Sequence, residues 1–476
     1  MDSEDFGMRI FYQHPQTAFG DCMPFWWKGT YFVFHQRDID LEHPLTVPFG
    51  WSLATTTDFV KYQDRGEVIP QGDDDDQDQF IYAGSVHVSP EGSPTALFTG
   101  YNDHFSSQGR PSQVLMRAQS ADGVHWEKEG TFELPPQPGY DPDDWRDPVV
   151  VRDPDNDRWI LVVGARLEGP KVQRTGRVVW YSSVDAEKWT FEGDLHAPGR
   201  YTMEEMPDLF QMGDQWYLLW TEYSDRSKTV YASGPCAVGP WTAPPDDAFD
   251  GRAYYAARTT SDGDRRFLFG WVANKAAARD VNPFVWAGTL VVHEIVQRAD
   301  GTLGVIMPQE LASAVMENGR ALDPVVLTNE AGRSVRTLGA LQETSYGVEA
   351  TVRVAPGTRS FSILFGGDPE LDDWYAYTVD FAERRVVFDR SPNFPWNRYD
   401  NKGLERPLPD SAAEQDIRVR LVVDETVAVL YLNDIALSTR VYEPCGTSVG
   451  IDVVGGGIEV KDIVVGEVPA PLSREY

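Results

Sequence analysis

Cysteine and histidine are both scarce in this sequence. It has 476 residues but only three cysteines, Cys22, Cys236 and Cys445, and eight histidines. An odd number of widely spaced cysteines argues against a disulfide framework, and no two of them form a C-x-x-C metal motif. The histidines show no spacing typical of a zinc site. We therefore expect three reduced thiols, no zinc site and no cofactor.

Long apolar runs and basic residues are also lacking. No segment approaches the roughly 20 apolar residues of a membrane-spanning helix, and the acidic N-terminus shows no secretory signal, so we expect a cytoplasmic protein. The 42 Lys and Arg against 74 Asp and Glu give a net charge of −32. This field repels nucleic acids and anionic membranes. We expect a neutral small molecule or oligosaccharide as the partner, and find no signal for an oligomeric state.

Long helical patterns are rare, whereas aromatic residues, 41 glycines and 33 prolines are abundant. This composition is typical of many short strands joined by turns. One pattern occurs three times, because Asp58, Asp122 and Asp185 are each followed four residues later by Tyr or Trp. Their spacings of 64 and 63 residues indicate an internal repeat.

Five apolar, aromatic-rich segments follow the same repeat. They are residues 31–34, 96–99, 159–162, 216–219 and 267–270. Their spacings of 65, 63, 57 and 51 residues leave room for roughly four short strands in each unit. Five such units before about residue 311 predict a five-bladed β-propeller. A β-sandwich of the same length is the alternative, but it would not require five matched units.

The pattern changes after a short helix expected at residues 311–317. Alternating apolar and polar residues then predict further strands, at 346–354, 374–380, 417–423 and 427–432. Such a run of strands is typical of a β-sandwich. The expected fold class is therefore all-β, with a propeller at residues 1–318, a linker at 319–335 and a β-sandwich at 336–476.

Three acidic residues occupy the same position in the repeat. Asp21, Asp147 and Glu205 lie 10, 12 and 11 residues before the repeated segments of their units. For any one acidic residue, a solvated surface position is the better expectation. Equivalent positions in successive blades lie around one axis, however, so these three carboxylates are expected to converge on a central funnel.

Converging carboxylates have a specific chemical use. Mutual repulsion raises the pKa of at least one of them, which places an acid and a base side by side. Arg146 is expected to keep its neighbour Asp147 ionised. Two carboxyl groups about 5–5.5 Å apart are the apparatus of retaining glycoside hydrolysis. The propeller is therefore the expected catalytic domain of a glycosidase.

A metal ion is the competing use of clustered carboxylates. Ca²⁺ takes 6–8 oxygen ligands, which such a cluster supplies in part. The acidic run at residues 73–78 is a second candidate, but it lacks the D-x-D-x-D-G spacing of a calcium loop. A solvated turn is the better interpretation of that run, and we expect no metal at either place.

Three motifs resemble those of glycoside hydrolase family 32, the invertase and fructanase family. Residues 17–25 (TAFGDCMPF) stand where the family has W-M-N-D-P-N-G. Residues 145–148 (WRDP) match its R-D-P motif, and residues 203–210 (MEEMPDLF) match W-E-C-P-D-L-F. The third match makes Glu205, and not Glu204, the motif glutamate. The resemblance extends over nearly the whole chain, and the family architecture is a five-bladed propeller followed by a β-sandwich.

The resemblance implies a role for each carboxylate. Asp21 would be the nucleophile, Glu205 the general acid/base, and Asp147 would bind the furanose hydroxyls in the transition state. Further side chains would hold the fructosyl ring, namely Gln36, Trp51, Tyr82, Arg146, Tyr255 and Trp286. For a tryptophan taken alone, packing in the core is the usual role. The position of these residues within the motifs favours contact with sugar.

Other positions depart from the family pattern. Gly20 replaces the motif asparagine, Glu204 and Met206 replace a Trp and a Cys, and Ala83 and Ala253 replace a Ser and an Asp. The reaction class is therefore better supported than the identity of the sugar. The first hypothesis is hydrolysis of β-fructofuranosides, including sucrose and fructans. The alternatives are fructosyl transfer through the same intermediate, including within one chain to give a difructose anhydride, and a sugar-binding propeller without activity.

Overall fold

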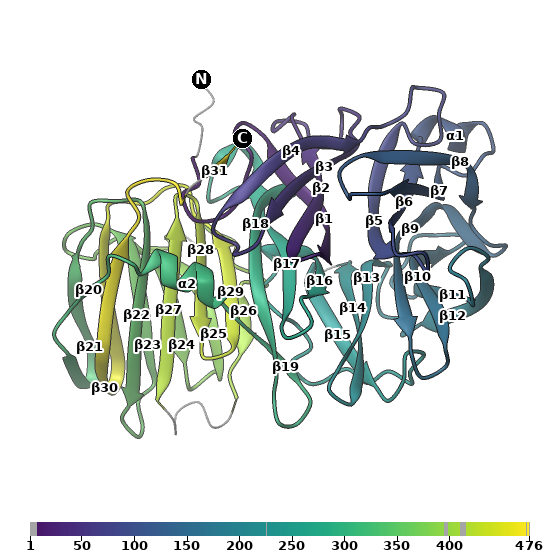
Figure 1. Cartoon of the computed structure of the whole chain (residues 1–476). Helices are drawn as coiled ribbons and strands as arrows, with labels where there is room; N and C mark the ends of the chain where they lie inside the picture. Colours follow the sequence, from purple (N-terminus) through teal and green to yellow (C-terminus); the bar gives the residue numbers. More distant parts are fainter. Residues whose placement is uncertain (1–6, 225, 395–397, 410–415, 473, 476) are drawn as a thin grey trace.

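A computed structural model describes residues 7–224, 226–394, 398–409, 416–472 and 474–475. Figure 1 shows two assemblies of strands side by side, one built from the first two thirds of the chain and one from the last third. The prediction of an all-β chain, with a propeller followed by a β-sandwich, is confirmed. No helix in the described part of the chain is long and apolar enough to span a bilayer.

Five blades, each an antiparallel sheet, make up the propeller. Blades 1 and 2 contain β1 (Ala18–Trp27), β2 (Thr30–Asp38), β3 (Trp51–Thr56) and β4 (Tyr62–Ile69), then β5 (Phe80–Val88), β6 (Pro94–Tyr101), β7 (Gln113–Ser120) and β8 (Trp126–Leu134). Blade 3 contains β9 (Tyr140–Asp153), β10 (Arg158–Leu167), β11 (Gly176–Ser183) and β12 (Thr190–His196). Blade 4 contains β13 (Met203–Met212), β14 (Gln215–Tyr223) and β15 (Thr229–Gly234).

Blade 5 closes the ring. It contains β16 (Tyr254–Ser261), β17 (Arg266–Lys275) and β18 (Phe284–Gln297), with β19 (Leu303–Ile306) paired to β18. Strand β18 also pairs with β1, with Phe19 opposite Gly288, which joins the last blade to the first. Short helices lie between strands: α1 (Asp103–Ser107), η1 (Ala276–Ala278) and α2 (Gln309–Val315).

The repeated aspartates lie two residues after the third strand of blades 1 to 3. The side chain of Asp122 accepts hydrogen bonds from the N–H groups of Val124 and His125, at 2.9 and 2.8 Å. Asp58 and Asp185 accept equivalent bonds from the residues two and three positions later. An Asp that satisfies its own turn in this way makes a tight connection to the fourth strand. The five repeated apolar segments lie on the second strands, β2, β6, β10, β14 and β17.

The remaining strands form the β-sandwich. They are β20 (Arg320–Ala321), β21 (Val325–Ala340), β22 (Ser345–Val354), β23 (Ser360–Gly367), β24 (Trp374–Asp380), β25 (Arg385–Ser391), β26 (Glu405–Pro407), β27 (Ile417–Asp424), β28 (Val427–Leu432), β29 (Ile435–Arg440) and β30 (Ser448–Glu467). Strand β30 pairs with β23 before Gly455 and with β22 after it, so it connects the two layers. Gly455 and Gly456 have φ of 59° and 151°, which favour glycine at this bend.

The segment expected as a linker differs from the prediction. Residues 319–335 contain β20 and most of β21, and both strands pair with β30. Because both strands are hydrogen-bonded to β30 along their length, they belong to the sheet of the sandwich. The predicted ranges of the two domains, 1–318 and 336–476, stay predictions.

Propeller and sandwich share one hydrophobic core. Its buried side chains include Leu268 and Val291 of blade 5 together with Leu430 and Leu437 of the sandwich. Strand β31 (Arg474–Glu475) pairs with β4, which brings the end of the chain back to blade 1. We infer that the sandwich fixes the position of blade 5, which contributes to the site described next.

Candidate active site

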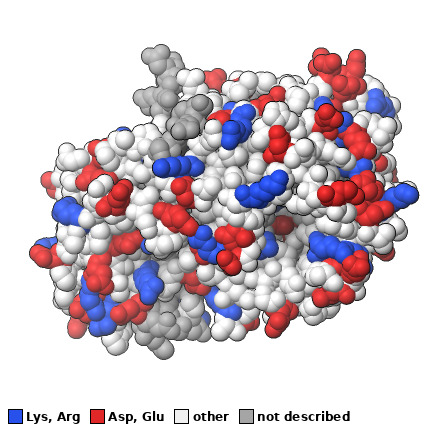
Figure 2. Space-filling model, in the orientation of Figure 1, with Lys and Arg blue, Asp and Glu red and all other residues white. Residues whose placement is uncertain are grey.

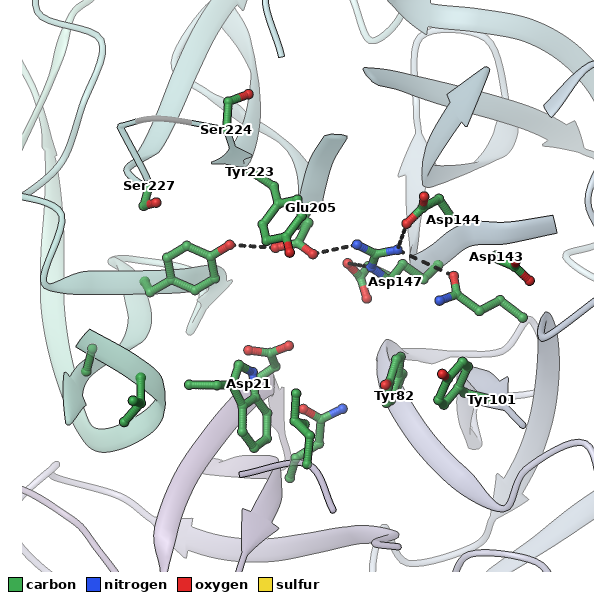
Figure 3. Close-up of a pocket in the computed structure, with 18 of the residues that line it drawn as sticks. Asp21, Tyr82, Tyr101, Asp143, Asp144, Asp147, Glu205, Tyr223, Ser224 and Ser227 are labelled. Carbon is green, nitrogen blue, oxygen red and sulfur yellow. Dashed lines mark hydrogen bonds and ion pairs between the residues drawn. The ribbon is translucent and has the colours of Figure 1, made fainter. Parts of the chain in front are cut away.

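A cavity of about 970 Å³ opens at one end of the propeller axis. Asp21, Asp147 and Glu205 all line it, and they come from β1, β9 and β13, the first strands of blades 1, 3 and 4. Figure 3 shows Asp21 and Glu205 facing each other across an open space, with Asp147 beside them. The structure thus brings together the three carboxylates whose convergence the sequence predicts.

An interruption in each first strand turns these side chains toward the cavity. The pairing shifts by a β-bulge between Phe19 and Cys22 in blade 1, after Tyr82 in blade 2 and after Glu205 in blade 4. In blade 3 the bulge is at Asp147, which has φ of 63°. Bulges re-aim side chains beside active sites, and a positive φ at a residue other than glycine stores strain there.

Five of the six predicted sugar-binding residues also line the cavity, namely Gln36, Tyr82, Arg146, Tyr255 and Trp286. The rings of Trp286 and Phe49 stack with centroids 5.9 Å apart and planes 9° apart. Tyr82 stacks on Tyr101 with centroids 4.6 Å apart. These two stacked pairs give the cavity aromatic walls.

The placement of Trp51 in the sugar site is wrong. Its side chain is fully buried and packs between Phe34 and Phe98. The indole Nε1 donates a hydrogen bond of 3.1 Å to the carbonyl oxygen of Tyr82. Trp51 lies on β3, the third strand of its blade, so the blade interior surrounds it. It supports Tyr82 and does not face the cavity.

Glycine at position 20 has a structural reason. A Cβ built there would lie 2.5 Å from Cη2 of Trp286 and 3.1 Å from Cβ of Gln36. Contacts below 3 Å require something to shift, so Trp286 occupies the space that a side chain at position 20 would fill. The departure from the family motif and the position of Trp286 are therefore coupled.

Asp21 is held by a residue that the sequence reasoning missed. Trp271 Nε1 donates a hydrogen bond of 3.0 Å to Asp21 Oδ1. Burial and the charges of Asp147 and Glu205 raise the pKa of Asp21 to about 8, against the opposing effect of Trp271. Trp271 directly follows the repeated segment at residues 267–270. An aromatic residue next to that segment was the available signal.

Glu205 is fixed at both oxygens. Arg146 Nη2 donates to Oε1 at 2.5 Å, and the Tyr255 hydroxyl donates to Oε2 at 2.6 Å. The neighbouring Glu204 is fully buried, and its Oε2 interacts with His196 Nδ1 at 3.0 Å. The choice of Glu205 over Glu204 as the residue of the site therefore agrees with the geometry.

Arg146 interacts with three carboxylates. It donates to Asp144 Oδ1 at 2.8 Å and to Glu205, and its Nε lies 3.8 Å from Asp147 Oδ2. Burial raises the pKa of Asp147, and Arg146 opposes this rise, so the expectation that Arg146 keeps Asp147 ionised stays a prediction. At Asp144 burial also opposes ionisation, but Arg146, Arg166 and other cations lower its pKa to about 2. Asp144, two residues before the R-D-P motif, was also missed.

Asp147 is held by three other blades. Its N–H donates to Thr99 Oγ1 of blade 2 at 3.0 Å, and its Oδ2 accepts from the Met206 N–H of blade 4 at 2.9 Å. Arg258 of blade 5 donates to its carbonyl oxygen at 2.6 Å. These contacts compensate for the strained backbone at this residue.

Further lining residues were not anticipated. They are Tyr101, Gln113, Lys171, Arg252 and Phe284, among others. Gln113 Oε1 accepts from the Trp145 N–H at 2.8 Å. These residues lie on strands and loops outside the three motifs, so no repeat position marked them.

The structure also bears on the metal alternative. Within the described residues, no group of three or more His, Cys, Asp and Glu side chains is placed to hold a metal ion. In the acidic run, the Asp73 N–H donates to Asp76 Oδ2 at 2.9 Å. Asn102 Nδ2 donates to the carbonyl oxygens of Asp74 and Asp76. The run therefore forms a hydrogen-bonded turn.

Comparison with known proteins agrees with this geometry. Residues 22–303 match the model of the glycosyl hydrolases family 32 N-terminal domain. The chain is 26% identical over 442 residues to a sucrose-6-phosphate hydrolase of Escherichia coli, covering 88% of this chain and 85% of that protein. It is 24% identical over 449 residues to a raffinose invertase of the same organism, with the same coverage.

A solved structure has the same fold. The crystal structure of fructan 1-exohydrolase IIa from Cichorium intybus superposes with a TM-score of 0.79 at 16% sequence identity. The alignment covers 100% of this chain and 99% of that one. At this identity the likeness concerns the fold.

Proposed function

The chain belongs to family 32 of the glycosyl hydrolases, and we propose that it is a retaining β-fructofuranosidase for neutral fructosides. As a member of this family it is a glycosidase. The observation that carries the proposal is the convergence of Asp21, Glu205 and Asp147 on one cavity with aromatic walls. Relatives named as invertase and levanase support the choice of fructosides as substrates.

In the first step Asp21 is the nucleophile. Its carboxylate attacks the anomeric carbon of the fructosyl unit, while Glu205 gives its proton to the departing glycosidic oxygen. The glycosidic bond breaks and an ester forms between Asp21 and the fructosyl unit. The hydrogen bond from Trp271 holds Asp21 Oδ1, and the contacts of Glu205 with Arg146 and Tyr255 fix its direction.

In the second step Glu205 acts as the base. It takes a proton from a water molecule, whose oxygen attacks the anomeric carbon and releases Asp21. Two inversions restore the original configuration. With methanol as the acceptor, we therefore expect methyl β-fructofuranoside as the product.

The first step needs Asp21 as a carboxylate and Glu205 with its proton. Burial and the charges of Asp147 and Glu205 raise the pKa of Asp21 to about 8. In the wild type kcat/KM should therefore rise as the pH approaches 8, because the Asp21 carboxyl then loses its proton and becomes a nucleophile.

The third carboxylate, Asp147, is proposed to bind furanose hydroxyls. Its Oδ2 is taken by the Met206 N–H, and we assign Oδ1 to the sugar. In Asp147→Asn the amide oxygen keeps the bond to Met206, but an NH₂ group then meets the sugar. Because the lost charge stabilises the positive ring of the transition state, kcat should fall about 100-fold while KM changes little. Steady-state kinetics on sucrose measure both; a change in KM alone would contradict the assignment.

The charges of the cavity favour a neutral leaving group. Six carboxylates line it, Asp21, Asp103, Asp143, Asp144, Asp147 and Glu205. Its three lining cations, Arg146, Lys171 and Arg252, each already face a carboxylate. On the face shown in Figure 2, acidic side chains are likewise interspersed with the basic ones. A phosphorylated sugar would add negative charge to a cavity whose described lining cations each already face a carboxylate.

A substrate panel tests the proposed function. We expect fructose release from sucrose, raffinose or a fructan, with kcat/KM for sucrose at least about 10-fold above that for sucrose 6-phosphate. Faster hydrolysis of sucrose 6-phosphate would contradict the neutral substrate. Fructosyl oligosaccharides as main products would indicate transfer, and binding without release would indicate a propeller that only binds sugar.

A further inference from the structure

Arg258 lies at the centre of the propeller, between two cavities. It belongs to β16 of blade 5 and is only 2% exposed. It lines a second cavity of about 470 Å³, built from later parts of the first strands, at the other end of the axis. Its guanidinium reaches the carbonyl oxygen of Asp147, a residue that lines the first cavity. Arg258 therefore sits beneath the candidate active site.

The guanidinium connects three blades. Nη2 donates to the carbonyl oxygen of Asp147 at 2.6 Å, and Nη1 donates to the carbonyl oxygens of Pro148, at 3.3 Å, and of Gly84. Asp147 and Pro148 form the bulge of blade 3, and Gly84 ends the bulge of blade 2. A planar group with several donors is suited to this bridge.

The charge of Arg258 is buried without an ion pair. Among the described residues, no carboxylate oxygen lies within 4 Å of its guanidinium nitrogens. Burying a cation beside neutral carbonyl groups costs free energy. The negative charges of Asp147, Asp208 and Asp21, which lie close enough to interact, offset part of that cost.

We propose that Arg258 is a positioning residue, which holds the bulge that aims Asp147 and places a positive charge beneath Asp21 and Asp147. The roles of these two carboxylates rest on the proposed function. Arg146, the other arginine of the site, is occupied by Asp144 and Glu205. Arg258 is therefore the cation that balances Asp21, and it shares Asp147 with Arg146.

The electrostatics of the site agree with this role. Arg258 opposes the rise in pKa that burial causes at both Asp21 and Asp147. The charged and titratable groups that interact with Asp21 come from four other strands and its own: Asp147, Glu205, Arg258, Cys22, Tyr82 and Tyr255. Arg258 is the cation among them, so its removal should raise the pKa of Asp21 further.

Two substitutions separate its charge from its shape. Arg258→Gln keeps a hydrogen-bond donor but loses the charge, whereas Arg258→Lys keeps the charge but loses the planar fork. Arg266 offers matched controls, because it is a nearby arginine that donates to Thr259 Oγ1 at 2.8 Å and lines only the second cavity. The measurement is kcat/KM against pH for wild type, both Arg258 variants, Arg266→Gln and Arg266→Lys, with thermal unfolding as the check on folding.

We expect the pH profile of kcat/KM to shift only when the positive charge at position 258 is lost. In Arg258→Gln the profile should move to higher pH by about one unit, the size of an ordinary shift caused by a nearby charge. In Arg258→Lys the rate should fall about 10-fold with the profile in place, because the bulge loses its bridge. Both Arg266 variants should keep the wild-type profile.

Other outcomes decide against the proposal. Equal midpoints for Arg258→Gln and Arg258→Lys would overturn the role of the charge. If Arg258→Gln does not fold, Arg258→Met replaces it. If neither neutral variant folds while Arg258→Lys folds and is fully active, the role of Arg258 is purely structural. A wild type inactive on every fructoside would instead refute the proposed function, which keeps the two failures distinct.

Discussion

Asp21→Asn is expected to lower kcat on sucrose by about 10⁴-fold or more, because an amide cannot form the ester with the fructosyl unit. The variant keeps the shape of the side chain and an oxygen for the hydrogen bond from Trp271. The loss should therefore occur in a folded protein. Residual activity above about 1% on an activated aryl fructoside would remove Asp21 from the role of nucleophile.

The same variant should be more stable than the wild type at neutral and alkaline pH. The pKa of Asp21 is about 8 in the folded protein and about 4 in the unfolded chain. Between these values the folded state binds a proton that the unfolded state has released, so the wild type loses stability as the pH rises. Asn has no such proton, so its advantage should grow from pH 5 to pH 8 by up to about 1.4 kcal/mol for each pH unit.

Asp64→Asn is the matched control with the opposite sign. Asp64 is a buried carboxylate outside the cavity that accepts from Arg37 Nη2 at 2.6 Å. Although burial opposes ionisation, the Gly66 N–H and Arg37 lower its pKa. This variant should lose stability at neutral pH and keep its activity. Thermal unfolding of both variants at pH 5 and pH 8, together with kcat on sucrose, measures the difference between them. A falling Tm in Asp21→Asn at pH 8 would contradict the raised pKa.

The second large effect is expected for Glu205→Gln, with kcat on sucrose about 10²- to 10⁴-fold lower. The amide oxygen still accepts from Arg146, and the NH₂ group still meets the Tyr255 hydroxyl, so the geometry is kept. Because an amide gives no proton to the departing oxygen, substrates with poor leaving groups should suffer most. An aryl fructoside needs no proton in the first step, because its leaving group departs as an anion. Azide should rescue the second step, because it attacks the anomeric carbon without the help of a base.

The adjacent Glu204 provides the control. Like Glu205 it is a glutamate, but its carboxylate interacts with His196 and does not line the cavity. Glu204→Gln should keep the same rate ratio between sucrose and an aryl fructoside as the wild type. Kinetics on both substrates, with and without azide, measure the difference. A uniform loss in Glu205→Gln, independent of leaving group and azide, would make Glu205 structural.

The sequence by itself determined the repeat. Blades of similar length place equivalent residues at equivalent positions around an axis, so the turn aspartates and the register of Asp21, Asp147 and Glu205 were readable from spacing alone. Local hydrogen bonds form the turns, as at Asp122. The alternation of apolar and polar residues predicts the main sandwich strands, but it does not predict most of β21, because the pairing of β21 with β30 joins residues more than 100 positions apart.

Only the tertiary structure decided which side chains meet between blades. Trp51 is buried by Phe34 and Phe98, although its motif position favoured contact with sugar. Arg146 is next to Asp147 in sequence, yet its hydrogen bonds go to Asp144 and to Glu205 of another blade, and its contact with Asp147 is the longer one, at 3.8 Å. The bridge made by Arg258 likewise joins residues of different blades, and such contacts depend on how the sheets pack around the axis, which spacing along the chain does not encode.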